Sequence, residues 1–192
     1  MGETDTHTDE VVHEPSAAFV EASNVAEFMD AHGIDSFEEL HRRSTTEVEG
    51  VPSGLDWFWD QVVDHLGLEF YEPYDAVRDE SDGPQFTEWY VGGELNIAHN
   101  VVDRHARPES PTRNTVATIW EGEDGEIREV TYHELHRQTN QIANALEERG
   151  VGTGDTVGLY MPMVPEVVSI LYACFKVGAI AVPIFSGFGV DA

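Results

Sequence analysis

The spacing of apolar residues predicts that the last part of the chain alternates strands with helices. From Thr115, VATIW and EIREVTY are short strand-like runs separated by GEDG, which predicts a hairpin. Thr131 and Glu134 can form a capping box, and apolar residues then follow the helical period until Gly150. TVGLYM and AIAVPIF flank a second helix, PEVVSILYACFKVG. This strand–helix–strand order predicts a βαβ crossover in a mostly parallel sheet, so the fold class is α/β.

The preceding residues carry shorter patterns, and the chain divides into three predicted regions. Residues 1–15 predict a disordered acidic tail, residues 16–106 a helical and irregular extension, and residues 107–192 the start of the α/β domain. Within the extension, DWFWDQVVDHLG and LNIAHNVVDRHA predict helices. Residues 69–94 combine prolines and glycines with aromatic residues, which predicts an irregular segment fastened by aromatic contacts.

Two short helices are predicted early in the extension from their start signals. Asn24 with Glu27 can form a capping box, and this helix would end at Gly33. Ser36 with Glu39 can cap the next helix.

The charge of the chain changes the picture of its environment. Asp and Glu total 37 against 10 Lys and Arg, the net charge is -27, and Lys176 is the only lysine. We interpret this composition as adaptation to strong salt, where counterions screen the repulsion between carboxylates. The alternative is an acidic surface that binds a partner. Nucleic acid is not an expected partner, because binding phosphates needs clustered cations.

Cysteine content and hydropathy indicate a cytoplasmic protein. Cys174 is the only cysteine, which rules out an internal disulfide framework, and the acidic N-terminus lacks the pattern of a signal peptide. The apolar stretch 167–185 raises the question of a membrane span. Lys176, Gly178 and Pro183 interrupt this stretch, so a helix followed by a strand explains it better and no membrane contact is expected.

The glycine run and the histidines do not form a recognisable site. GVGTGD, residues 150–155, follows a helix and opens a strand, whereas phosphate-binding glycines follow a strand and open a helix. His133 and His136 are three residues apart on a predicted helix, but no further ligands complete a metal site. His99 and His105 do not share a helix face. We therefore expect a turn and structural histidines.

The two candidate nucleophiles also lack the residues that would activate them. Cys174 lies among apolar residues and is expected to be a small buried side chain. Ser186 precedes a glycine but lacks the G-x-S-x-G pattern of a nucleophile elbow. The residues by themselves therefore predict no catalytic set and no metal site.

Four stretches taken together resemble AMP-forming acetyl-CoA synthetases, which belong to the adenylate-forming superfamily. They are TEWYVGGELNIAHNVVDRH, REVTYHELHRQTNQIANAL, YMPMVPE and VPIFSGF, and the resemblance runs in order from about Trp57 to Ala192. It implies an enzyme that uses ATP and Mg²⁺ to turn a short-chain carboxylate into an acyl-adenylate, from which coenzyme A takes the acyl group.

The resemblance places one functional position in this chain. It implies that the turn after the last strand, Phe185, Ser186 and Gly187, lies beside bound coenzyme A. Ser186 departs from the glycine that the family commonly has there. The family's phosphate loop, acyl pocket, adenine site and C-terminal domain have no counterpart here, and Lys176 matches none of their residues.

The expected function is therefore that of the N-terminal portion of a short-chain acyl-CoA synthetase, with an incomplete N-terminal domain. Such a chain is expected to be inactive alone and to bind neither ATP, Mg²⁺ nor coenzyme A tightly. A second polypeptide could complete the domain. The alternatives are a non-catalytic interaction module and a gene remnant.

Overall fold

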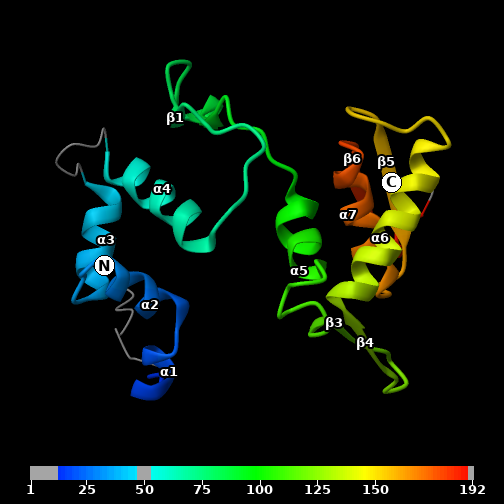
Figure 1. Cartoon of the computed structure of the whole chain (residues 1–192), viewed down its shortest axis with the longest axis horizontal. Coiled ribbons are helices and arrows are strands. Elements are labelled where there is room, and N and C mark those ends of the chain that lie inside the picture. The colour runs from blue at the N-terminus through cyan, green and yellow to red at the C-terminus, as the bar shows by residue number, and fades with distance from the viewer. Residues whose placement is uncertain (1–12, 47–52, 190–192) are drawn as a thin grey trace, which may run out of the picture. The chain divides into compact units, whose positions relative to one another are not determined.

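The computed structural model describes residues 13–46 and 53–189, which form two compact units divided between Gly67 and Leu68 (Figure 1). The predicted tail, residues 1–15, lies almost wholly outside the described residues. The domain boundary expected at residue 106 stays a prediction. The first unit contains four helices among its described residues: α1 (Ala17–Glu21), α2 (Asn24–Ala31), α3 (Phe37–Thr45) and α4 (Gly54–Leu66).

The helices of the first unit begin at serine caps. The Ser36 hydroxyl accepts a hydrogen bond from the Glu39 backbone N–H at 3.2 Å, which confirms the predicted start of α3. The cap expected at Asn24 is wrong: Ser23, in extended backbone, accepts from the Ala26 N–H at 3.2 Å instead. A serine hydroxyl one residue earlier reaches the same orphan donors, so Asn24 becomes the first helical residue.

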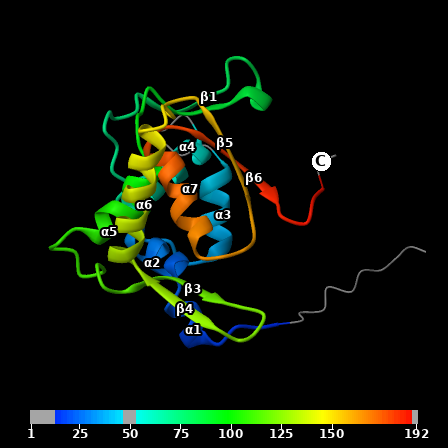
Figure 2. The same cartoon turned by 90° about the vertical axis from the view of Figure 1, so that its right-hand side faces the viewer.

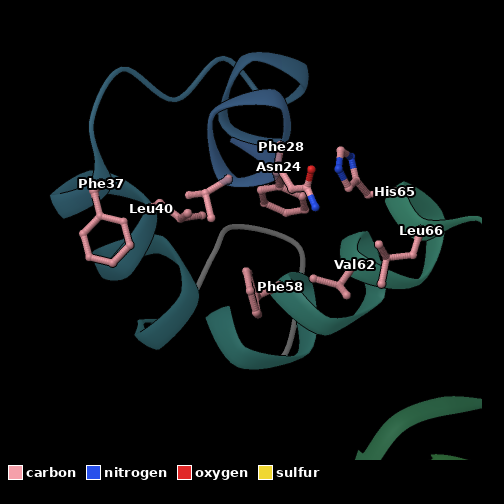
Figure 3. A pocket seen from close by; sticks show the side chains of 9 residues that line it. Asn24, Phe28, Phe37, Leu40, Phe58, Val62, His65 and Leu66 are labelled. Carbon is pink, nitrogen blue, oxygen red and sulfur yellow. The ribbon is translucent and has the colours of Figure 1, made fainter. Parts of the chain in front are cut away.

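The first unit packs around aromatic side chains from α2 and α4. Phe28 and Trp57 are buried, and their ring centroids lie 6.3 Å apart in an edge-on arrangement. Beside them, an apolar cavity of about 260 Å³ is bounded by side chains from α2, α3 and α4, including Leu40 and Val62 (Figure 3). The segment DWFWDQVVDHLG is thus confirmed as a packing helix, ended by Gly67 in the left-handed conformation at φ 57°.

The second unit opens with a small hairpin that the sequence pattern missed. β1 (Ala76–Asp79) pairs antiparallel with β2 (Glu88–Val91), and the 3₁₀ turn η1 (Pro84–Phe86) lies between them. Tyr74 and Tyr90 ring centroids are 5.1 Å apart, so the predicted aromatic fastening is confirmed. A π-helical turn η2 (His99–Asp103) and α5 (Arg104–Ala106) follow.

The remainder of the second unit matches the predicted α/β order. It comprises the hairpin β3 (Val116–Glu121) and β4 (Ile127–Thr131), then α6 (Tyr132–Glu147), β5 (Thr156–Met161), α7 (Glu166–Lys176) and β6 (Ile180–Phe185). β5 and β6 pair in parallel, and Thr131 with Glu134 forms the capping box of α6. The hairpin projects beyond one end of the α6–α7 pair (Figures 1 and 2). The α/β fold class is confirmed.

A closed ring of polar contacts joins η2, α6 and α7. The Lys176 ammonium lies 2.7 Å from the Asp103 carboxylate and donates to the Asn140 side-chain oxygen at 2.6 Å. Because that oxygen accepts from Lys176, the Asn140 amide nitrogen donates to His136 Nε2 at 2.9 Å, and His136 Nδ1–H donates to Asp103 at 2.8 Å. The only lysine of the chain therefore fixes the packing of three elements.

Candidate functional site

The carboxyl ends of β5 and β6 form the candidate site. The two strands are in register, so that Met161 at the end of β5 is paired with Phe185 at the end of β6. Open sheets of parallel strands bind ligands in the crevice outside these ends. The topology therefore brings the predicted turn to the edge of the sheet where such proteins hold ligands.

The turn after β6 is ordered by Tyr160. Its hydroxyl lies 2.8 Å from the Phe188 carbonyl oxygen and 3.2 Å from that of Ser186, and it can donate to either. The Phe188 backbone N–H donates to the Phe185 carbonyl oxygen at 3.0 Å, which closes the turn. Gly187 leaves room for the Phe185 ring, because a Cβ on Gly187 would lie 2.6 Å from the ring edge.

A cavity of about 320 Å³ lies against this turn. Phe185 and Ser186 line it together with apolar side chains from β5, α7 and the β5–α7 turn, while Gly187 is not among the lining residues. Met163 and Phe185 are strongly exposed, at 80% and 66%. The lining is thus apolar with one hydroxyl, a surface suited to holding a ligand rather than to transferring protons.

The β3–β4 hairpin holds the β5–α7 turn in place. Trp120 Nε1–H donates to the Met163 carbonyl oxygen at 2.7 Å, and Arg128 forms an ion pair with Glu166 at 2.7 Å. The hydrogen bond from Arg128 lowers the pKa of the Glu166 carboxyl. The sequence motif YMPMVPE marked this turn, but no local signal indicated that the hairpin would anchor it.

The structure also brings together histidines that the sequence kept apart. His99, His133 and His136 line one cavity, together with Asp103, although His99 lies on a different helix from the other two. Among residues 13–46 and 53–189, no group of three His, Cys, Asp or Glu side chains could hold a metal ion. The link between these histidines arises from the packing of η2 against α6, which spacing along the chain does not reveal.

The other candidates take the structural roles expected of them. Cys174 is fully buried, and burial raises the pKa of its thiol, so it packs as a small apolar side chain. Gly150 and Gly154 adopt φ values of 83° and 85° in the turn from α6 to β5, which confirms a connecting turn. None of the helices that the structure describes is long and apolar enough to cross a membrane.

Two family models match consecutive parts of the chain. The model described as "Acetyl-coenzyme A synthetase N-terminus" matches residues 37–101, and the model described as "AMP-binding enzyme" matches residues 104–192. Among solved structures, acetoacetyl-CoA synthetase from Streptomyces lividans aligns with a TM-score of 0.78 and 29% identity. The alignment covers 93% of this chain and 27% of that one.

Curated relatives give the same picture. The acetyl-coenzyme A synthetase of Thiobacillus denitrificans is 38% identical over 181 residues, covering 94% of this chain and 25% of that protein. That of Deinococcus radiodurans is 36% identical over 197 residues, covering 100% and 27%. The 3-hydroxypropionyl-coenzyme A synthetase of Metallosphaera sedula is 41% identical over 135 residues, covering 70% and 20%. The chain thus spans about a quarter of the length of the curated relatives it matches.

Proposed function

Because this chain belongs to the family of AMP-forming acetyl-coenzyme A synthetases, we propose that it supplies the N-terminal portion of an acyl-CoA-forming ligase. In the proposed reaction, a carboxylate oxygen of a short-chain acid attacks the α-phosphorus of ATP and pyrophosphate leaves. The thiol of coenzyme A then attacks the acyl carbon, AMP leaves, and the thioester forms. The carrying observation is the match of two family models in consecutive order over residues 37–101 and 104–192.

We assign one ligand contact to this chain, the turn of Phe185, Ser186 and Gly187 against coenzyme A. Its place at the carboxyl end of a parallel strand supports the assignment. The exposed apolar cavity lined by Phe185 and Ser186 supports it further. The Ser186 hydroxyl has no hydrogen-bond partner among the residues that the structure describes, so it is available to a ligand.

The described residues do not provide a site for the Mg²⁺ ion that the proposed reaction uses. No group of three His, Cys, Asp or Glu side chains within them could hold Mg²⁺. We propose that the ATP, Mg²⁺ and carboxylate sites are made by residues corresponding to the other three quarters of the relatives' length. The 192-residue chain alone would then catalyse no adenylation, and a second polypeptide could supply those residues.

A chimaera tests the proposed function. The aligned first quarter of the Thiobacillus denitrificans enzyme is replaced by this chain, and acetate-dependent and propionate-dependent formation of CoA thioester is measured in strong salt. Activity of the chimaera, with no ATP–pyrophosphate exchange by this chain alone, is the expected result. An inactive but folded chimaera contradicts the proposal, and exchange by the chain alone contradicts its dependence on other residues.

Paired glycine variants test the coenzyme A contact in the same chimaera. Gly187→Ala pushes against the Phe185 ring, whereas a Cβ at Gly189 meets no atom within 4 Å. We expect Gly187→Ala to raise KM for coenzyme A roughly tenfold, the equivalent of about 1.4 kcal/mol, while Gly189→Ala leaves it unchanged. If the two substitutions change KM for coenzyme A equally, the turn is not a coenzyme A contact.

We also propose that the protein works in a salt-rich cytoplasm. The net charge of -27 and the single lysine support this environment, because strong salt screens the repulsion between carboxylates. The single, buried Cys174 suits a reducing compartment. Unfolding free energy measured against KCl concentration tests the proposal, which requires stability to rise up to molar salt.

A further inference from the structure

The cavity lined by His99, His133 and His136 also carries two arginines. It has a volume of about 430 Å³ and lies between the η2–α5 segment, the loop after α5 and the start of α6. Its ionisable lining residues are His99, Asp103, Arg107, Arg113, His133 and His136. Only one of these six is acidic, in a chain whose carboxylates outnumber its Lys and Arg by 37 to 10.

The acidic groups at this cavity are already paired with cations. Asp103 is neutralised by Lys176 at 2.7 Å and accepts from His136. Glu69 pairs with Arg107 at 2.8 Å and also accepts from His99 at 2.6 Å. These contacts leave Arg113 as the cation of the lining whose charge is not offset.

Arg113 has no carboxylate partner among the described residues. Its guanidinium donates to the Ala106 carbonyl oxygen and lies 3.4 Å from His133 Nε2. A guanidinium has five N–H donors, so these two contacts leave three unused. Because Arg113 can only donate, His133 Nε2 is the acceptor and its Nδ1 carries a proton that has no partner in the described structure. A guanidinium with unused N–H donors binds anionic acceptors through charge-assisted hydrogen bonds.

We propose that this cavity binds a phosphate group, either free or in a small phosphate monoester, with Arg113 as the principal ligand. Arg107 lines the same cavity. Its guanidinium makes two contacts with Glu69 and lies 3.4 Å from His99 Nε2, which leaves at least two of its five N–H donors unused. Donors from two arginines in different positions suit a tetrahedral oxyanion, whose oxygens point in several directions, better than a planar carboxylate. The cavity has room for an organic substituent. This site is separate from the β6 turn and does not depend on the proposed ligase reaction.

Binding to the full chain tests the proposal directly. Inorganic phosphate and glycerol phosphate are titrated by calorimetry at constant ionic strength in KCl, and Tm is followed in parallel. We expect saturable binding with a matching rise in Tm. Phosphate also stabilises proteins in general, but that rise in Tm continues with concentration and does not saturate. The shape of the titration curve therefore separates it from binding at a site. Tighter binding of glycerol phosphate identifies a monoester site, and equal or weaker binding identifies a site for the free ion.

Matched arginine variants complete the test. Arg113→Gln should weaken phosphate binding at least tenfold. Arg149→Gln should leave it unchanged, because Arg149 is exposed and, among the described residues, donates only to the Ala145 carbonyl oxygen. If Arg113→Gln does not fold, Arg107→Gln takes its place, since that side chain is 42% exposed. The proposal is overturned if phosphate binding does not saturate, or if Arg113→Gln (or Arg107→Gln in its place) binds phosphate as well as Arg149→Gln does.

Discussion

Replacing Lys176 by Met should destabilise the second unit far more than removing a surface cation. The Lys176 and Asp103 side chains are only 16% and 23% exposed, and the ammonium contacts two oxygens at 2.6 and 2.7 Å. Breaking a buried ion pair costs about 3–5 kcal/mol, and the remaining exposure reduces that to about 3 kcal/mol here. For a chain of this size the loss corresponds to a fall in Tm of roughly 6–12 °C.

The assay is urea unfolding followed by circular dichroism, in salt that keeps the chain folded. Arg128→Gln is the matched control, because it removes one cation from an exposed ion pair with Glu166, where solvent screens the interaction. In a double-mutant cycle, Lys176→Met and Asp103→Asn together should cost at least about 1 kcal/mol less than the sum of the single changes. A loss of unfolding free energy in Lys176→Met no larger than that in Arg128→Gln, or additive effects of Lys176→Met and Asp103→Asn, would show that the ion pair does not stabilise the second unit.

Four further outcomes follow from the structure. Leu159→Ala, in the core beneath α7, should lower the free energy of unfolding by about 3 kcal/mol in denaturant titrations. Hydrogen bonds from His99 and Arg107 lower the pKa of Glu69 from 4.5 to about 2. The unsubstituted chain should therefore be more stable than Glu69→Gln. This difference in unfolding free energy should be complete above pH 4.5 and vanish as the pH falls through about 2, as measured by urea titrations across that range. Burial raises the pKa of the Cys174 thiol, so a thiol reagent should label it only after unfolding, and labelling of the native chain would contradict its position. Lowering KCl should shift the urea midpoint downwards, and a midpoint independent of salt would argue against adaptation to strong salt.

Local sequence patterns were sufficient to predict the helices and strands of the α/β part of the chain. The capping box at Thr131 and Glu134 and the two apolar strands act within a few residues, so the sequence shows them directly. The hairpin of β1 and β2 was not predicted because each strand has only four residues, too few to establish an alternating pattern. Its pairing depends instead on ring contacts such as that between Phe70 and Tyr90, which the sequence does not rank above other aromatic pairs.

The polar cavity could not be predicted for a different reason. Its donors come from η2, from the loop after α5 and from α6, so their proximity depends on tertiary packing. His99 and His133 are separated by 34 positions, and neither follows a known ligand spacing. The candidate turn at Phe185, in contrast, could be located from the sequence, because the end of a parallel strand fixes its position in the fold.

The near absence of lysine becomes informative once the remaining lysine has a place in the structure. In a chain with 37 Asp and Glu against 10 Lys and Arg, the single lysine is a candidate for a specific structural task. Lys176 bridges Asp103 and Asn140 through donors that diverge from one nitrogen, a geometry that the planar fork of arginine does not reproduce. Arg113, like the exposed Arg149, has no carboxylate partner in the described structure, but Arg113 lines a cavity where its unused N–H donors are available to the proposed phosphate. Lys176 is therefore a packing element, and the position of Arg113 in a cavity, rather than the composition of the chain, marks it as the proposed phosphate ligand.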